Sequence, residues 1–194
     1  MRVFPRVLAV FGLAALALAG PARAETPPPQ PPIDMQKVYG GWYMIATIPN
    51  SFEKGMVAPH DAYSRRPDGD LQEDFTFRPG GFAAPEKHYT VHDWVRPGTG
   101  NRHWRVQVFW PIDLPFLVLY VDKDYRYIIF GEEDRQLGWI FSRTQTIPPA
   151  DYADLLKRFA ALGYDPDKLV KFVQTPDQIG KPGYWSEGLE AAGK

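Results

Sequence analysis

The chain contains 194 residues, of which 44% are hydrophobic, 23% charged and 14% aromatic, and it contains no cysteine. The absence of cysteine excludes disulfides, thiolate metal sites, cysteine nucleophiles and lipid attachment to a cysteine. Lysine and arginine number 22 against 23 aspartate and glutamate residues, so no overall basic field indicates nucleic-acid binding. The length is typical of one domain, and that domain must accommodate the surplus of aromatic side chains.

The first 24 residues have the pattern of a cleaved export signal. Arg2 and Arg6 precede an apolar run over residues 7–19, and Ala22-Arg23-Ala24 places small residues at the positions that a signal peptidase checks. The run is shorter than the roughly 20 residues that a transmembrane helix needs, and an uncleaved membrane anchor is the alternative. Residues 1–24 are therefore predicted to be a signal peptide.

The regions flanking the body differ from it in composition. Residues 25–37 are rich in proline and are predicted to form an extended linker, because proline fixes φ and removes amide donors. The folded domain is predicted over residues 38–176. Residues 177–194 contain glycine and little periodicity, which predicts a flexible tail whose Tyr184-Trp185 pair is able to dock.

From residue 40 to residue 143, aromatic or β-branched stretches alternate with turns rich in glycine, proline, aspartate or asparagine. This pattern and the short spacing predict an all-β domain, an eight-stranded antiparallel up-and-down β-barrel. The predicted strands are 42–48, 61–65, 72–78, 88–95, 102–110, 116–121, 125–130 and 138–143.

The period changes after the eighth strand. Apolar residues then recur at spacings of three and four, which predicts one amphipathic helix that ends at Gly163 and packs against the outside of the sheet. Its apolar stripe consists of Tyr152, Leu155, Leu156, Phe159 and Leu162. A short ninth strand is predicted over residues 169–174.

Three motifs in this order resemble the signatures of the lipocalin family. Tyr39-Gly40-Gly41-Trp42 resembles the Gly-x-Trp signature, and residues 49–55 resemble the segment that follows it in bacterial, outer-membrane-type lipocalins related to apolipoprotein D. Asp122-Lys123-Asp124-Tyr125 resembles the Thr-Asp-x-x-Tyr signature, with Val121 in place of threonine. Residues 139–144 resemble the third signature, in the last strand before the helix.

The resemblance implies a structural role for the signature residues Gly40, Trp42, Asp122, Tyr125 and Arg143. A glycine before the first strand allows a sharp entry into the barrel. Trp42 then closes one end of the barrel, with the Arg143 guanidinium stacked on its indole face. Many bacterial lipocalins of this type are lipoproteins, whereas this chain has no cysteine to carry a lipid.

Residues two apart on a strand share a face, so Trp42 and Arg143 predict which side chains face the barrel interior. Counting from Trp42 gives Met44 and Ala46, and counting from Asp122 gives Tyr120. The predicted interior is aromatic and aliphatic with hardly a charge, and the resemblance implies that it holds a ligand, the alternative being a filled core. The predicted ligand-contacting side chains are Met44, Phe75, Phe77, Trp104, Val106, Val108, Phe116, Val118, Tyr120, Trp139 and Phe141.

Other chemistry finds little support in the sequence. His88 and His92 share a strand face, but four residues along a strand separate their rings by about 13 Å, which is too far to share one metal ion. Glu53, Asp61 and Glu73 are interpreted as solvated faces and loop ends rather than acid–base pairs. No catalytic residue, metal site or cofactor is predicted.

Two surface features bear on how a ligand is bound. Lys54, Arg65 and Arg66 are predicted either to form a basic rim at the barrel mouth or to be ordinary surface charges. The apolar stretch from Ile112 to Leu117, placed at a turn, is predicted to cover the mouth or to contact a second copy, with a membrane surface as a further alternative.

The resemblance implies a protein without enzymatic activity that binds, stores or transports a small hydrophobic ligand in the periplasm. A fatty acid or lysophospholipid is the expected ligand, with a homodimer and peripheral contact with the outer membrane as further options. The alternative function is an enzyme of the isomerase or peroxidase type on a lipocalin barrel, acting on a lipid or carotenoid. His88, His92 and Tyr120 are then the candidate reactive groups.

Overall fold

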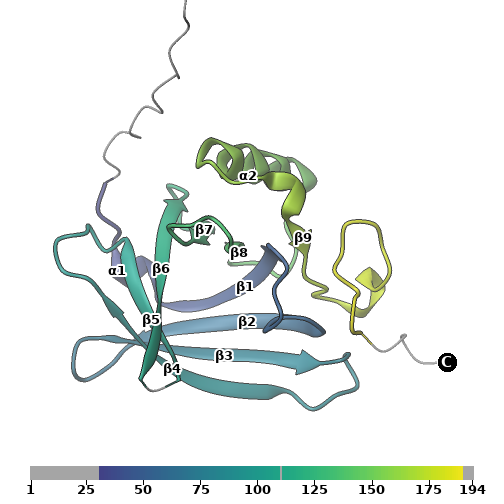
Figure 1. The fold of residues 1–194 in the computed structure, drawn as a ribbon, viewed down its shortest axis with the longest axis horizontal. Helices are drawn as coiled ribbons and strands as arrows, with labels where there is room; N and C mark the ends of the chain where they lie inside the picture. The colour runs from purple at the N-terminus through teal and green to yellow at the C-terminus, as the bar shows by residue number, and fades with distance from the viewer. Residues whose placement is uncertain (1–30, 110, 190–194) are drawn as a thin grey trace, which may run out of the picture. The chain divides into compact units, whose positions relative to one another are not determined.

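The computed structural model describes residues 31–109 and 111–189, so the predicted signal peptide lies outside the described residues (Figure 1). The predicted eight-stranded antiparallel barrel with one main helix is confirmed. Its elements are α1 (Met35–Val38), β1 (Gly40–Thr47), β2 (Met56–Arg65), β3 (Leu71–Pro79), β4 (Lys87–Val95), β5 (His103–Phe109), β6 (Ile112–Val121), β7 (Tyr127–Gly131), β8 (Gly138–Ser142), α2 (Pro149–Ala161), η1 (Pro166–Lys168), β9 (Val170–Lys171) and η2 (Pro176–Gln178). None of the helices in the described ranges combines the length and apolar character that a membrane crossing requires.

The strands form one sheet that closes on itself. Each strand from β2 to β8 pairs with the next in the chain, and β1 pairs with both β8 and β2, which closes the barrel. The short β9 adds to the second half of β1. The turns therefore alternate between two ends, which we call the floor (α1 and residues 66–70, 96–102 and 122–126) and the mouth (residues 48–55, 80–86 and 132–137).

β-Bulges in β1 and β6 change which of the predicted side chains face the interior. In β1, Met44 pairs with Phe141 but Ala46 pairs with Ile140, so Ile45 is an extra residue and the later side chains change face. Ala46 consequently packs in the cluster beneath α2. The prediction that Ala46 faces the interior is wrong, because a one-residue bulge reverses the alternation.

The apolar side chains divide into an interior cluster and an outer cluster. The outer cluster joins the predicted stripe of α2, centred on Leu155 and Phe159, to Ile129 and Ile140 on the sheet. Figure 1 shows α2 beside β7 and β8, as the amphipathic pattern predicts. The helix therefore covers the outside of the barrel and leaves the interior to the strands.

The floor is closed by Trp42 beneath Arg143. The Arg143 guanidinium carbon lies 3.6 Å from the centre of the Trp42 ring, and the indole N–H donates to the Val38 carbonyl at 2.7 Å. The same guanidinium donates to five main-chain carbonyls, those of Lys37, Val38, Tyr39, Gly41 and Tyr125. The stacking implied by the resemblance is thus present, and it is anchored by main-chain acceptors.

Asp122 and Tyr125 hold the turn between β6 and β7. The Asp122 carboxylate accepts from the main-chain N–H groups of Arg126 and Tyr127. Tyr125 has a φ of 55°, and its hydroxyl accepts from the Asp34 N–H at 2.8 Å. The turn is therefore tied to the segment that precedes α1.

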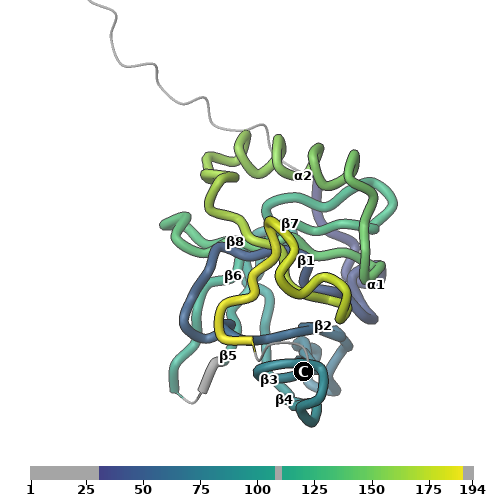
Figure 2. Tube along the Cα trace, turned by 90° about the vertical axis from the view of Figure 1, so that its right-hand side faces the viewer, coloured from purple at the N-terminus to yellow at the C-terminus, as the bar shows by residue number. Residues whose placement is uncertain are grey.

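The chain segments that precede β1 and follow β9 both pack against the barrel. Ile33, within the predicted linker, is buried, and its N–H donates to the Gly100 carbonyl at 2.9 Å. In the C-terminal segment, coloured yellow in Figure 2, the main-chain N–H of Trp185 donates to the Lys171 carbonyl and the Trp185 ring packs near Phe172. The folded part therefore extends beyond residues 38–176 at both ends.

Gln174 joins the two strands where the barrel closes. Its amide nitrogen donates to the Met44 carbonyl at 2.8 Å and to the Pro59 carbonyl at 3.0 Å. Direct pairing between β1 and β2 ends at Tyr43 and His60. The side chain therefore supplies hydrogen bonds across the part of the seam that the ladder does not reach.

Replacing Gly40 by alanine is expected to lower the free energy of unfolding by about 1–2 kcal/mol. Gly40 has a φ of 92°, and the space beside it is not crowded, since an added Cβ meets only the Arg143 Nη1 atom at 3.5 Å. The loss therefore comes from backbone strain. Urea unfolding measures it, and an unchanged transition midpoint contradicts this role for Gly40.

Candidate functional site

The barrel interior is walled by the side chains that the alternation predicts, with two exceptions. Eight of the predicted residues belong to or pack against the interior cluster: Met44, Phe75, Phe77, Trp104, Phe116, Val118, Trp139 and Phe141. Val106 is paired with Asp93 and Leu114, and this register places it on the same face. The backbone of Val108 lies in β5, but its side chain is outside the described part of the structure.

Tyr120 is the second exception, and the prediction that it faces the interior is wrong. Val118 pairs with Phe130, but Tyr120 pairs with Ile129, so Leu119 forms a bulge and the alternation reverses. Tyr120 packs in the outer cluster, where the Arg158 guanidinium lies 4.5 Å from its ring centre.

The inner face of the barrel is more exposed at the mouth than at the floor. Along the inner face of β4, Lys87 and Tyr89 are exposed, Val91 is half-buried and Asp93 is fully buried. Tyr89 is 52% exposed although it is paired with Phe75 on the inner face. The exposure of the inner-face side chains therefore rises from the floor to the mouth along this strand.

Aromatic rings fill the lower part of the barrel. The Phe130 ring lies 4.4 Å from Phe116, 5.0 Å from Phe141 and 5.5 Å from Trp104, measured between ring centres. Trp104 and Phe141 are fully buried, whereas Phe116, Trp139, Phe75 and Phe77 are half-buried. The half-buried rings are thus the wall available to a ligand.

Three carboxyl groups lie inside the barrel, directly above its floor. Asp61, Glu73 and Asp93 come from the adjacent strands β2, β3 and β4, and all three are buried. Asp61 is paired with Trp42 and Phe75, and Glu73 with Tyr63, so all project from the inner face. We call these three residues the carboxyl layer.

The carboxyl layer is short of hydrogen-bond donors. Tyr63 donates its hydroxyl to Asp61 Oδ2 at 3.3 Å. No donor of the described chain reaches Asp61 Oδ1 or either oxygen of Asp93. None of the ion pairs in residues 31–109 and 111–189 involves the layer.

Burial keeps the layer protonated at pH values where free carboxyl groups are ionised. Burial raises the pKa of Glu73 to about 7. Burial, then the neighbouring Glu73 charge, raises the pKa of Asp93 to about 10. Burial and the Glu73 charge likewise raise the pKa of Asp61. The three carboxyl groups thus hold their protons to higher pH than free carboxyl groups do.

The interpretation of Asp61 and Glu73 as solvated groups is therefore wrong. Glu73 lies two residues before Phe75 on the same strand, so the alternation that predicted Phe75 also places Glu73 inside. Asp93 lies two residues before Val95, which packs against the interior cluster. The alternation of side chains along each strand was enough to place these residues inside. Carboxyl groups are rarely buried, and for this reason they were interpreted as solvated.

At the mouth, Glu53 is a buried acceptor rather than a solvated group. Its carboxylate accepts from the Trp139 indole N–H at 2.7 Å, from the Thr47 hydroxyl at 2.8 Å and from the Asn50 amide at 2.7 Å. Burial raises its pKa, and these donors partly oppose the rise. Glu53 thereby fixes the β1–β2 loop and the Trp139 ring beside the opening.

The predicted basic rim is not formed. Lys54 lies at the mouth, paired with Glu187, whereas Arg65 and Arg66 lie at the floor end of β2. A ten-residue strand separates the two groups by roughly 30 Å. Lys87, which is paired with Phe77, is instead the basic residue on the inner side of the mouth.

The apolar stretch from Ile112 to Leu117 lies in a strand rather than a turn. It belongs to β6, in the hairpin that reaches the mouth. Ile112 and Leu114 are exposed, and Leu114 is paired with the inward-facing Val106. This placement supports the prediction that the stretch lies at the mouth of the barrel.

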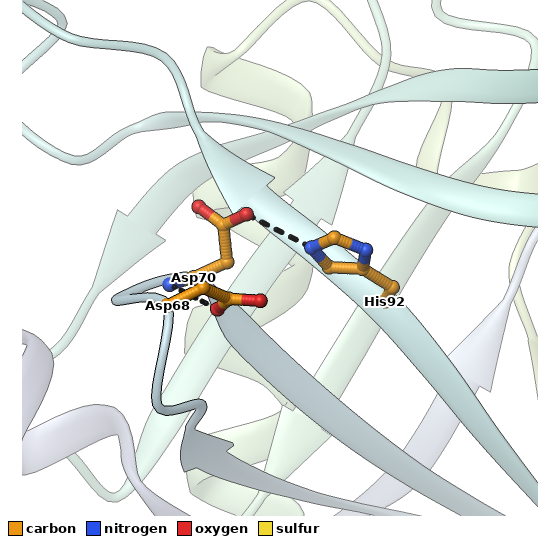
Figure 3. Close-up of side chains that lie close together, drawn as sticks. All are labelled: Asp68, Asp70 and His92. Carbon is orange, nitrogen blue, oxygen red and sulfur yellow. Dashed lines mark hydrogen bonds and ion pairs between the residues drawn. The ribbon is translucent and has the colours of Figure 1, made fainter.

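The histidines His88 and His92 lie on the outer face of β4. His88 is 3.2 Å from Asp74, and His92 is 2.9 Å from Asp70. Figure 3 shows His92 with Asp70 and Asp68, whose ligand atoms all lie within 4.8 Å of one another. Because Asp68 also accepts from Arg66 at 3.1 Å, we interpret this group as a surface charge network.

A groove of about 420 Å³ lies outside the barrel between the β6–β7 turn and α2. Its charged groups are paired, Arg126 with Asp122 and Asp151, and Arg158 with Asp154. The groove therefore offers no unpaired charge, and the barrel interior is the stronger candidate site.

Comparison with known proteins agrees with this architecture. Residues 33–174 match the family described as a lipocalin-like domain. The chain is 29% identical to temperature-induced lipocalin-1 of Arabidopsis thaliana over 154 residues, covering 74% of this chain and 80% of the relative. It is 29% identical to the outer membrane lipoprotein Blc of Escherichia coli K12 over 184 residues, covering 91% and 99%.

Insecticyanin from the tobacco hornworm Manduca sexta has the same fold, with a TM-score of 0.60 and 18% identity over 81% of this chain and 87% of that one. Three observations therefore indicate the same family: the signature residues at the floor, the closed barrel and the match over most of the sequence. The chain belongs to the lipocalin family, whose barrels bind small hydrophobic molecules.

Proposed function

We propose that the protein binds and carries a single-chain fatty-acyl molecule, a fatty acid or lysophospholipid, in the barrel interior. The observation that carries this proposal is the wall above the carboxyl layer, where Phe75, Phe77, Phe116 and Trp139 are half-buried on the inner face of the barrel. Burying an acyl chain against these rings contributes roughly 25 cal/mol per Å² of apolar area.

The head group of such a ligand stays at the mouth. A phosphate or carboxylate finds no counter-charge at the carboxyl layer, because the charged groups around Asp61, Glu73 and Asp93 in the described residues are themselves acidic. Lys87 at the mouth offers a cation on the inner side, next to Phe77. The acyl chain therefore enters first, and the anionic group remains in water beside Lys87.

Binding, rather than chemistry, is the proposed activity. His88 and His92 lie on the outer face of β4, and Tyr120 lies beneath α2. The three groups that an isomerase or peroxidase was expected to use thus have no access to a ligand inside the barrel.

The proposed compartment is the periplasm. The relatives named outer membrane lipoprotein Blc support export, as does the signal-like pattern of residues 1–24. The sequence offers no cysteine for a lipid anchor.

Titration with oleate and with oleoyl lysophosphatidylglycerol, followed by tryptophan fluorescence, is expected to saturate, because Trp139 lies in the proposed wall. Replacing Phe77 by alanine is expected to weaken binding about tenfold, since apolar contact is lost. Tyr120→Phe, on the outer side of the barrel, serves as the control and keeps the affinity unchanged. Absence of a saturable signal with both lipids overturns the proposed function.

A further inference from the structure

The carboxyl layer is the feature of the interior that an acyl chain does not explain. A ligand that is apolar along its whole buried length leaves the free oxygens of Asp61 and Asp93 without a donor. A buried polar group without a partner destabilises the folded protein by about 1–3 kcal/mol. Two such groups, Asp61 and Asp93, in a layer of three carboxyl groups from successive strands are thus complementary to a ligand whose buried end carries hydrogen-bond donors.

The geometry of the strands brings the three groups to one level. Asp61 is paired with Phe75 and Tyr63 with Glu73, so Asp61 and Glu73 are diagonal neighbours on β2 and β3. Leu71 is paired with Asp93 and Glu73 with Val91, so Glu73 and Asp93 are diagonal neighbours on β3 and β4. Diagonal side chains on one face of a sheet are within reach of each other.

The surroundings of the layer exclude an intrinsic counter-charge. The charges that perturb Asp61, Glu73 and Asp93 within the described chain are carboxylates, and none of them is basic. Tyr63 and Trp104 form an edge-to-face pair beside the layer, with ring centres 5.4 Å apart. Carboxylate oxygens together with aromatic faces are the groups that bind organic cations.

We propose that the carboxyl layer receives the protonated amino group of a long-chain amine, whose hydrocarbon chain runs along Phe75 and Phe77 towards the mouth. The inference rests on the proposed use of the barrel interior as a binding site, and it adds a ligand class with the opposite orientation. The ammonium group supplies up to three N–H donors to the free oxygens of Asp61 and Asp93.

The occupant is an organic amine rather than a metal ion because of what lies above the layer. Calcium is bound by six to eight oxygen atoms, which include carbonyls and waters. The wall between the layer and the mouth is instead aromatic and aliphatic, formed by residues such as Phe75, Phe77 and Val106. A cation with a long apolar substituent satisfies both parts of the interior at once.

The test compares dodecylamine, dodecanol and dodecanoate, which share one chain length, by competition against a fluorescent apolar probe. The wild-type protein is expected to bind dodecylamine at least tenfold more tightly than either other ligand. Glu73→Gln and Asp93→Asn keep the side-chain shape and are expected to reduce this preference to less than threefold. The control is Asp74→Asn, the next residue on β3, whose side chain faces outwards to Thr90 and His88 and whose loss leaves the preference intact.

Calorimetry in buffers of different ionisation enthalpy gives an independent readout. Because the empty layer holds protons, binding of dodecylamine is expected to release protons in the wild-type protein and fewer in Glu73→Gln. Circular dichroism confirms that each variant is folded before its affinity is measured.

The outcomes separate the two proposals. Equal affinity for the three ligands, or an amine preference that survives in both lumen variants, overturns the amine site while oleate binding upholds the proposed function. Amine preference without binding of oleate or lysophosphatidylglycerol upholds the amine site and overturns the fatty-acyl proposal. Displacement of dodecylamine by millimolar calcium but not by an apolar competitor assigns the layer to a metal ion and overturns the amine site.

Discussion

Replacing Arg143 by alanine is expected to lower the free energy of unfolding by about 3–5 kcal/mol. The guanidinium stacks on Trp42 at 3.6 Å and donates to main-chain carbonyls on both sides of the floor, including those of Lys37 and Tyr125. Removing it leaves these acceptors with water at best and uncovers one face of the indole. Urea unfolding followed by tryptophan emission measures the loss.

Arg158 provides a matched control for this measurement. Its guanidinium also lies over an aromatic ring, that of Tyr120, at 4.5 Å, and it forms an ion pair with Asp154. Because this pair is on the surface, Arg158→Ala is expected to lower stability by less than about 1 kcal/mol. Equal losses of unfolding free energy in the two variants contradict the view that the hydrogen bonds from Arg143 to main-chain carbonyls stabilise the protein.

The stability of the protein is expected to fall as the pH rises from about 4.5 to 7, and Glu73→Gln is expected to remove much of this fall. The pKa of Glu73 is raised to about 7 in the folded protein from an ordinary value of 4.5. The folded state therefore binds more protons than the unfolded state in this window, so stability decreases with increasing pH. The contribution is fully present below pH 4.5 and lost above pH 7.

The effect is large because Glu73 is buried. A shift of this size corresponds to about 3 kcal/mol, and Glu73→Gln is therefore expected to be about 2–3 kcal/mol more stable than the wild type at pH 8. The groups that face Glu73 are Asp61 and Tyr63 from β2 and Asp93 from β4, and the pKa of each is also raised by burial. These groups extend the fall in stability to higher pH in both the wild type and Glu73→Gln.

Denaturant unfolding at pH 5 and pH 8 checks this expectation. Asp74→Asn is the control, because hydrogen bonds from Gln72 and Thr90 lower the pKa of Asp74 below its ordinary value of 3.8, so its loss is expected to leave the change in stability between pH 5 and pH 8 unaltered. If the wild type gains stability between pH 5 and pH 8, or if Glu73→Gln leaves the slope unchanged, the carboxyl layer is ionised in the folded protein.

The sequence predicted the strands, the helix and the floor because these depend on local patterns. Alternation, turn residues and the apolar stripe of α2 act over a few residues, and the signature residues at Trp42 and Arg143 keep their roles. Parity failed at Ala46 and Tyr120, because each lies just after a bulge that adds one residue to its strand. A bulge depends on how two strands pair, and neither Ile45 nor Leu119 differs in type from its neighbours.

The candidate site was predicted in part. The aromatic wall at Phe75, Phe77 and Trp139 follows from alternation alone. The carboxyl layer did not emerge, because a buried carboxyl group is recognised from the burial of its neighbours on three strands rather than from its own residue type. Ile33 and Trp185, which lie outside the predicted bounds of the domain, reach the barrel through contacts distant in sequence.

The hydrogen bonds of Gln174 have a consequence for the order in which the barrel is completed. The two partners joined by its bond to Met44 are separated by 130 positions along the chain. The hairpins from β2 to β7 form between neighbours and need only short loops to close, whereas the seam needs β8, β9 and Gln174. Closure of the barrel therefore waits for β8 and Gln174, and the earlier hairpins form an open sheet until these late segments join β1.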